Sequence, residues 1–228
     1  MYKAPSHAIW KGRSNASERN TDLRWYQAIH LVDLLSTALP KLKKQQKGIV
    51  LLGFRCDEGV RRNQGRTGAF DGPVAIRKSC ANFAWHVEES SFILVDGGNV
   101  ECHDGMLEEA QDELAALVTK VMKHGYFPLV LGGGHEVAFG SYKGAFHFQQ
   151  QKIPDMGVIN FDAHFDLREY KDGANSGTPF LQIADLCSSH HARFNYLCLG
   201  IQPQSNTRTL FKKAEELNVD FLLGEDLV

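Results

Sequence analysis

The residues best suited to chemistry are two aspartates and a histidine at alternate positions. Asp162, His164 and Asp166 follow a short apolar run, 156–161. In an extended chain, side chains two residues apart point the same way at steps of about 7 Å, and curvature at the strand end would draw all three around a cation. Carboxylate and imidazole ligands suit Mn²⁺, Zn²⁺ or Fe²⁺. A self-satisfied Asp–His pair is the alternative, but three ionisable groups in an apolar strand are costly without an ion.

A fourth ligand is predicted at His135, which follows three glycines and the apolar run 127–131. Glycines let the backbone approach a partner closely, and a phosphate cradle before a helix is one interpretation. The spacing is not G-x-G-x-x-G, and no Gly-Lys-Ser/Thr follows. A histidine at the exit of a parallel strand therefore favours a metal ligand that reaches toward Asp162, with a helix-capping turn as the alternative.

Two further segments are candidates for ligand binding. Residues 173–180 include Asn175 and Ser176, whose small polar groups can hold a substrate, although a simple turn has the same composition. Residues 59–68 follow an apolar run and are rich in glycine and arginine. They predict either an anion site or an ordered loop held by salt bridges.

The elements that position these residues alternate along the chain. Six apolar runs are typical of buried parallel strands, and helical periodicity lies between them. The clearest helix starts with Asp104 as its cap and ends at Gly125. We therefore expect one domain over residues 1–228: a three-layer α/β fold with a mainly parallel sheet, helices on both faces and its site at the carboxyl ends of the strands. Strands are expected at 48–54, 92–95, 127–131, 156–161, 196–199 and 221–223, and helices at 21–40, 104–124, 137–150 and 207–217.

Composition narrows the class of protein. A net charge of −2 and 43% hydrophobic residues suit a soluble globular protein and exclude disorder, collagen and coiled coil. No apolar run approaches a membrane span and no secretion signal is present, so we expect no membrane partner. Five cysteines without C-x-x-C spacing indicate a reduced, cytoplasmic chain. The dispersed basic residues, densest at 41–47, predict a solvated face and no nucleic-acid partner.

The motifs resemble one family. Gly-Gly-Gly-His135, Asp162-Ala-His164-Phe-Asp166 and Ser176-Gly-Thr-Pro-Phe180 look like the ureohydrolase (arginase/agmatinase) family, which hydrolyses C–N bonds of guanidines and amidines with two Mn²⁺ ions. Within it, the wording of residues 10–13, 54–63, 132–137 and 160–168 resembles the formimidoylglutamase branch of histidine degradation. That branch converts N-formimino-L-glutamate to L-glutamate and formamide. Phe180 stands where arginases proper have a histidine, which argues against an arginase.

The resemblance implies roles for the candidate residues. Asp162 would bridge two Mn²⁺ ions, His135 and Asp166 would complete one metal site, and His164 would belong to the other. A hydroxide between the cations would attack the formimino carbon, and no catalytic side chain is identified in this chain. Arg168 is the candidate for a bidentate contact to a carboxylate of the small-molecule substrate, with a surface ion pair as the alternative. Asn175 and Ser176 are weaker candidates for substrate binding.

The chain departs from the family pattern near its end. No Asp-x-Asp follows Asp166, whereas the family has a later strand ending in a Ser-Phe-Asp-x-Asp type motif whose aspartates supply the remaining ligands. The family's sheet order is 2-1-3-8-7-4-5-6, so strands 7 and 8 would lie between the strands that precede His135 and Asp162. We therefore expect an incomplete arginase-like fold that lacks its C-terminal strands.

Three functions are consistent with these observations. The first is a Mn²⁺-dependent formimidoylglutamase. The others are another ureohydrolase, such as an agmatinase or guanidino-acid hydrolase, and a truncated, non-catalytic remnant that binds a metal or a full-length partner. A homo-oligomer is consistent with the sequence.

Overall fold

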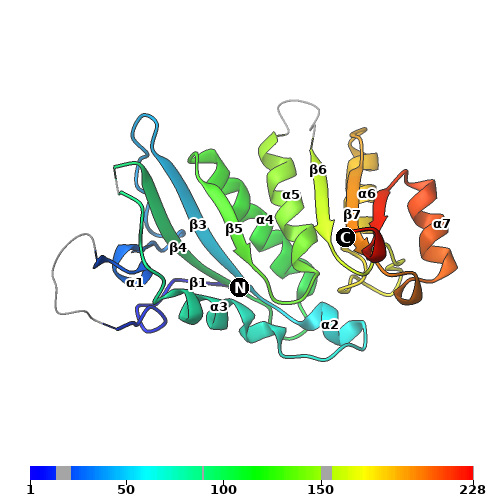
Figure 1. The fold of residues 1–228 in the computed structure, drawn as a ribbon, viewed down its shortest axis with the longest axis horizontal. Helices are drawn as coiled ribbons and strands as arrows, with labels where there is room; N and C mark the ends of the chain where they lie inside the picture. Colours follow the sequence, from blue (N-terminus) through cyan, green and yellow to red (C-terminus); the bar gives the residue numbers. More distant parts are fainter. Residues whose placement is uncertain (14–21, 89, 150–155, 228) are drawn as a thin grey trace.

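The computed structural model describes residues 1–13, 22–88, 90–149 and 156–227, whose strands form two sheets (Figure 1). The strands are β1 (Tyr2–Lys3), β2 (His30–Leu31), β3 (Lys47–Arg55), β4 (Phe92–Glu101), β5 (Phe127–Leu131), β6 (Gly157–Phe161), β7 (Asn195–Ile201) and β8 (Asp220–Leu223). The helices are α1 (Trp25–Ala28), α2 (Glu58–Arg62), α3 (Gly72–Cys80), α4 (Leu107–Lys123), α5 (Val137–Gln149), α6 (Pro179–Ser189) and α7 (Arg208–Glu216). No helix in this part of the chain is both long and apolar enough to cross a membrane.

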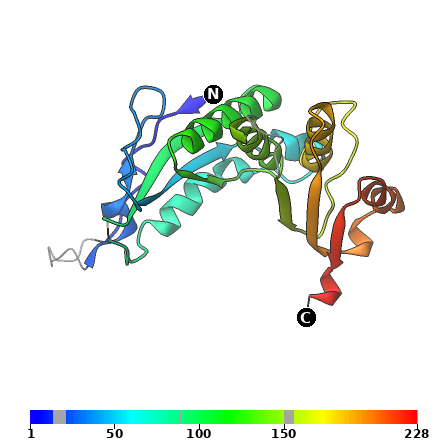
Figure 2. The same cartoon turned by 90° about the horizontal axis from the view of Figure 1, so that it is seen from above.

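The first sheet has the strand order β1-β4-β3-β5, with β2 also paired to β4. Only β1 runs antiparallel to its neighbour. Side chains alternate along β3, so Val50 and Leu52 pack with the apolar stripe of α4, while Leu51 packs with Trp10 and Ala81 on the other face. Figure 2 shows α4 and α3 on opposite faces of this sheet. The expected α/β fold, with a mainly parallel sheet between helices, is confirmed.

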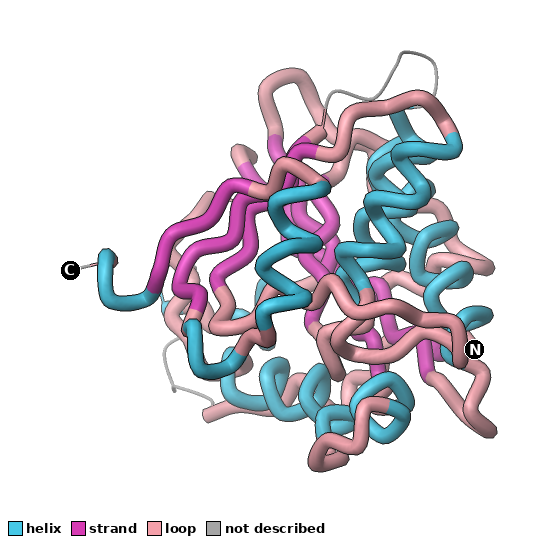
Figure 3. The backbone as a smooth tube through the Cα atoms, turned by 90° about the vertical axis from the view of Figure 1, so that its right-hand side faces the viewer, coloured by secondary structure: helices cyan, strands magenta, loops and turns pink. Residues whose placement is uncertain are grey.

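The second sheet contains the parallel strands β6, β7 and β8 in that order. Its core joins Phe146 of α5 and Ile183 of α6 to Tyr196 and Cys198 of β7. Figure 3 views the molecule from this end, with the strands beside their helices. The helices α5 and α6 also pack on each other, so they connect the second sheet to the first.

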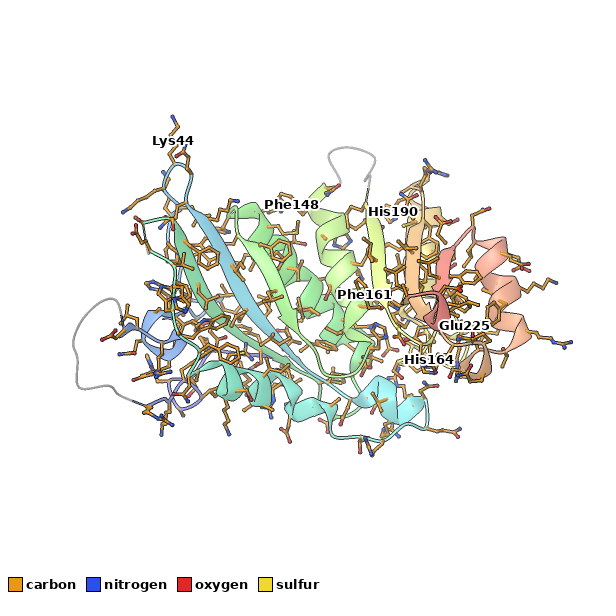
Figure 4. The ribbon with its side chains drawn as sticks, in the orientation of Figure 1. Lys44, Phe148, Phe161, His164, His190 and Glu225 are labelled. Carbon is orange, nitrogen blue, oxygen red and sulfur yellow. The ribbon has the colours of Figure 1, made fainter. Side chains whose placement is uncertain are left out.

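The two sheets meet at strands that do not pair with each other in the described part of the chain. β5 ends the first sheet and β6 ends the second, and α5 lies between them in Figure 1. Both strands carry exposed apolar side chains: Phe127 is 64% exposed, Ile159 65% and Phe161 79%. Figure 4 labels Phe161 on β6, beside this gap. Two apolar strands of the kind that is normally covered therefore present apolar surface here.

The prediction of a helix over residues 21–40 is wrong. The structure has only the single turn α1, followed by the short strand β2, and Thr21 lies outside the described residues. Ile29 takes an extended conformation, and His30 and Leu31 pair with Val95 and Asp96 of β4. Strand pairing has overridden a helical spacing of apolar residues, which is a weak local signal.

The other expected elements are present with two local differences. β4 extends to Glu101, well past the apolar run 92–95, because its polar residues are bonded inside the fold. Asp104 does not cap α4: its φ is 53° and the helix starts after Met106. Gly125 does end α4, with φ at 82°, and Gln150, the expected end of α5, lies outside the described residues.

Lys44, in the predicted basic segment 41–47, is exposed and projects from the loop before β3 (Figure 4), as expected for a solvated face.

A buried ion pair fastens α3 to β4. The guanidinium of Arg77 is fully buried, and its Nη2 lies 2.9 Å from Oδ1 of Asp96, which is 1% exposed. Nη1 donates to Oδ1 of Asn99 at 2.8 Å, and the indole of Trp10 donates to Oδ2 of Asp96 at 2.7 Å. Every partner of Asp96 is thus supplied by the protein, as a buried charge requires.

We predict that Arg77→Ala lowers the free energy of unfolding by about 3–5 kcal/mol, because it removes the only cation that pairs with buried Asp96 in the described chain. Its neighbour Lys78 is exposed on the same helix, so Lys78→Ala should change stability by no more than about 0.5 kcal/mol. Urea denaturation of both variants measures the difference. Similar losses in the two variants would contradict this account of the core.

Candidate metal centre

The three glycines before His135 serve the packing of the loop against β3. A Cβ on Gly133 would lie 1.9 Å from the carbonyl oxygen of Cys56, and the N–H of Gly134 donates to that same oxygen at 2.8 Å. The backbone approach that the glycines allow is therefore to the end of β3, and the phosphate-cradle hypothesis is not needed. The result is that His135 is held at the carboxyl end of the first sheet.

Loop curvature brings the two aspartates of the second sheet together. β6 ends at Phe161, and Asp166 has a φ of 48°, a left-handed conformation that aspartate tolerates better than most residues. Asn206, which is 7% exposed, accepts from the N–H of Phe165 and donates to the carbonyl of Ala163. The turn therefore has a fixed shape, and extended alternation along a strand is not what aligns the ligands.

His135 meets both aspartates across the gap between the sheets. Its Nδ1 lies 3.1 Å from Oδ2 of Asp162 and 2.7 Å from Oδ2 of Asp166. One ligand atom from each of the three residues lies within 4.8 Å of the others. Two carboxylate oxygens and one imidazole nitrogen form a donor set for a hard or borderline divalent cation, including Mn²⁺. The residues present thus fit a metal ion.

His164 lies apart from this group but beside its central member. Its Nδ1 lies 3.3 Å from Oδ1 of Asp162, and its side chain is 52% exposed. Figure 4 labels it in the loop below β6. Asp162 consequently faces His135 with one oxygen and His164 with the other, which is the arrangement that a carboxylate shared by two sites needs.

A proton on His135 compensates part of the negative charge of the cluster. Burial alone would lower the pKa of His135, but the hydrogen bonds and charges of Asp162 and Asp166 outweigh it and raise the pKa to about 9. Burial would raise the pKa of Asp162, whereas His135 and the backbone N–H of His164 lower it to about 2. At neutral pH an imidazolium therefore holds the two carboxylates together where a cation would bind.

Phe180 fixes the ring of His135. It is 2% exposed, meets that ring edge-on at a centroid distance of 5.4 Å, and stacks on Tyr196 at 4.4 Å. Edge-to-face and offset-stacked contacts of this kind are favourable. Phe180, which stands where arginases proper have a histidine, thus packs directly against a ligand of the candidate metal centre.

The three substrate-binding candidates differ in how much they are committed to the fold. Asn175 forms a local turn, since its Oδ1 accepts from the N–H of Gly177 at 2.9 Å. Ser176 accepts from Nδ2 of Asn63 at 3.1 Å. Arg168 is exposed, and its Nη1 donates to Oδ1 of Asn63 at 2.9 Å. Arg168 and Ser176 therefore meet at a residue to which the sequence assigned no role.

The arginine-rich loop after β3 is held by salt bridges. Arg62 lies 3.0 Å from Glu58 and 2.6 Å from Glu108, and it also donates to the carbonyl of Ala174. Arg61 lies 2.6 Å from Glu58. Both guanidinium groups have acidic partners, which favours the ordered-loop interpretation over an anion site.

Sequence reasoning missed a buried carboxyl in the loop 132–136, which connects β5 to α5 and is called the metal loop below. Glu136 is fully buried; its Oε1 accepts from the N–H of Gly59 at 3.0 Å, and its carbonyl accepts from Gln111. Burial raises the pKa of Glu136. Its position directly after His135 is the signal that could have identified it.

The chain and its fold match one group of known proteins. A model of the arginase family matches residues 47–227. The chain belongs to the arginase family. Formimidoylglutamases of Aeromonas salmonicida and Chromobacterium violaceum are each 46% identical over 219 residues, which are 96% of this chain and 66% of each relative. This arginase-family chain thus spans just under two thirds of the length of those relatives.

Solved structures of the family agree with the fold. Trypanosoma cruzi formiminoglutamase, whose structure contains Mn²⁺, superimposes with a TM-score of 0.70 at 29% identity over 79% of this chain and 61% of that one. Bacillus subtilis formimidoylglutamase gives 0.71 at 21% identity over 93% of this chain and 63% of that one. The second likeness supports the arrangement of elements alone.

We predict that Asp162→Asn weakens Mn²⁺ binding by at least about 100-fold, because losing even an outer-shell partner can cost that much and Asp162 is placed to be a direct ligand. Asp172→Asn makes the same change on an exposed residue nearby and should leave binding unchanged. Titration of free Mn²⁺ by electron paramagnetic resonance measures both. Equal effects of the two substitutions would remove Asp162 from the ligand set.

Mn²⁺ binding should also depend on pH through His135. A cation must displace the proton on Nδ1, so affinity should rise about tenfold per pH unit from pH 6 to pH 8 and level off only near pH 9, the pKa of His135. A histidine with an ordinary pKa would level off near pH 7. Titrations at pH 6, 7 and 8 distinguish the two, and a flat profile would contradict the assignment.

Proposed function

We propose that the protein is a Mn²⁺-dependent hydrolase of C–N bonds in linear amidines, and that it converts N-formimino-L-glutamate to L-glutamate and formamide. The observation that carries the proposal is the convergence of His135, Asp162 and Asp166 at the carboxyl ends of two parallel strands. Its specificity is supported by the 46% identity to formimidoylglutamases.

The chain's own residues have distinct parts in this reaction. His135, Asp162 and Asp166 would hold one Mn²⁺, and Asp162 with His164 would contribute to a second. Two bound Mn²⁺ ions supply Lewis acidity and lower the pKa of water. Arg168 would bind a substrate carboxylate, because a guanidinium matches carboxylate geometry. Ser176 shares Asn63 with Arg168 and would assist through its hydroxyl, and Asn175 shapes the turn before Gly177.

Among the residues that the structure describes, Asp162 and His164 are the candidates that face the second metal site, which needs further ligands. We propose that further strands of the protein fill the gap between β5 and β6 and bring the remaining ligands. The exposed Phe127, Ile159 and Phe161 support this, because apolar strands of this kind are normally covered. Residues 1–228 alone are then expected to bind at most one Mn²⁺, to lack turnover and to aggregate readily.

The cellular setting and the assembly of the protein are further parts of the proposal. All five cysteines are free thiols, which supports the proposal of a reduced, cytoplasmic protein. The proposed partner is a small-molecule substrate, and a homo-oligomer remains part of the hypothesis. An agmatinase or guanidino-acid hydrolase is the second candidate function, favoured by the same ligand set.

The proposal can be tested in a fusion. Residues 1–228 are joined to the part of the Aeromonas salmonicida formimidoylglutamase that its alignment leaves uncovered, and the product is assayed with Mn²⁺. We expect formamide from N-formimino-L-glutamate and no urea from agmatine or 4-guanidinobutyrate. Arg168→Lys should raise KM for the first substrate without lowering Mn²⁺ content, because lysine lacks the bidentate fork.

The controls separate the alternatives. Intact Aeromonas enzyme must release formamide in the same assay. Urea release by the fusion would favour the agmatinase or guanidino-acid hydrolase. A folded fusion that binds two Mn²⁺ ions but releases neither product would leave the non-catalytic remnant as the better account.

A further inference from the structure

Arg168 is held in place without an acidic partner in the described chain. Its Nη1 donates to the neutral oxygen of Asn63 at 2.9 Å, and its backbone N–H donates to the carbonyl of Gly177. The nearby carboxylates are engaged elsewhere: Glu169 pairs with Lys171 at 2.7 Å and Asp166 pairs with His135. An ordered guanidinium that has no counter-charge favours an anionic ligand.

The stem of Arg168 is restrained as well as its head. A Cβ on Gly177 would lie 3.1 Å from Cδ and 3.4 Å from Nε of Arg168. The side chain of Arg168 therefore packs directly against Gly177, which has no side chain. Contact with Gly177 and the bond to Asn63 together limit the rotamers available to a flexible arginine, which reduces the entropy lost when a ligand binds.

Asn63 connects this arginine to the second candidate. Its Oδ1 accepts from Arg168, while its Nδ2 donates to Oγ of Ser176 at 3.1 Å. Asn63 and Ser176 also both donate their backbone N–H to the carbonyl of Gly59, whose own N–H is held by buried Glu136. The carboxamide is thus positioned from the metal loop, independently of Arg168.

The neutrality of this amide matters for binding an anion. An aspartate at position 63 could accept from Arg168 equally well, but its charge would compensate the guanidinium and repel a carboxylate. Because Nδ2 of Asn63 donates to Oγ of Ser176, the hydroxyl of Ser176 acts there as an acceptor, and its proton can be donated to a ligand. The result is a full positive charge and an O–H donor beside one another.

We propose that Asn63 is a specificity-determining positioning residue, which orients Arg168 and Ser176 as one site for a carboxylate of an aliphatic acid substrate and adds no charge of its own. This inference rests on the proposed function, because it assigns the residue that sets carboxylate recognition at the same centre.

The test measures binding of glutarate by isothermal titration calorimetry, with glutaramide as the matched neutral probe, and uses the fusion described above, in which the exposed strands would be covered. The fusion with an unmodified residue 63 should bind glutarate more tightly than glutaramide. Asn63→Asp keeps the acceptor for Arg168, but it adds a negative charge and accepts the hydroxyl proton of Ser176 in place of donating to it. It should lower glutarate affinity about tenfold and glutaramide affinity much less. Asn218→Asp adds the same charge at an exposed site after α7 and should have little effect.

The possible outcomes distinguish failure of the role of Asn63 from failure of the proposed carboxylate site. If Arg168→Ala lowers glutarate affinity but Asn63→Asp does not, Asn63 is merely structural and the inference is overturned, while the carboxylate role of Arg168 stands. If the unmodified fusion does not prefer glutarate over glutaramide, the carboxylate site itself fails and the inference fails with it. Should Asn63→Asp not fold, Asn63→Ala decides: unchanged glutarate affinity overturns the inference, and a loss of about fivefold supports it.

Discussion

The repulsion between two converging carboxylates is the constraint around which this structure is organised. Asp162 and Asp166 come from one loop, and both place an oxygen within 3.1 Å of the same imidazole nitrogen of His135. Two negative charges at that separation are stable only beside a positive one. In the metal-free chain a proton on His135 fills that need, and a divalent cation would fill it with a larger charge and with direct ligand bonds.

The alignment of His135 with the two aspartates depends on contacts that connect two sheets whose strands do not pair with each other in the described residues. His135 follows β5 and Asp162 follows β6, so no strand hydrogen bonds fix one relative to the other in the described residues. Packing of α5 on α6 provides part of the connection. The remainder comes from α2 and its flanks: Gly59 binds Glu136, Arg62 binds Glu108 and the loop at Ala174, and Asn63 binds Ser176. The short helix α2 and its flanking residues therefore contact both the metal loop and the loop that contains Ala174 and Ser176.

Apolar runs were sufficient to predict β3 to β8, because a strand buried on both faces must be apolar along its length. They were not sufficient for the segment around Trp25, where pairing of β2 with β4 and packing on Trp10 overrode a helical spacing. Motif spacing placed Asp162, His164 and Asp166 around one cation, and the family resemblance assigned His135, Asp162 and Asp166 to one metal site. The spacing could not show that the turn at Asp166 separates His164 from them, nor that Asn63, Glu136 and Asn206 hold the site, because such bonds join segments far apart in sequence.

The most direct test of the central claim is a crystal structure of the protein grown with Mn²⁺, with diffraction recorded at the manganese absorption edge. The account predicts an anomalous peak within coordination distance of Nδ1 of His135 and of one carboxylate oxygen each from Asp162 and Asp166. A peak at other residues, or none at these three under saturating Mn²⁺, would contradict it.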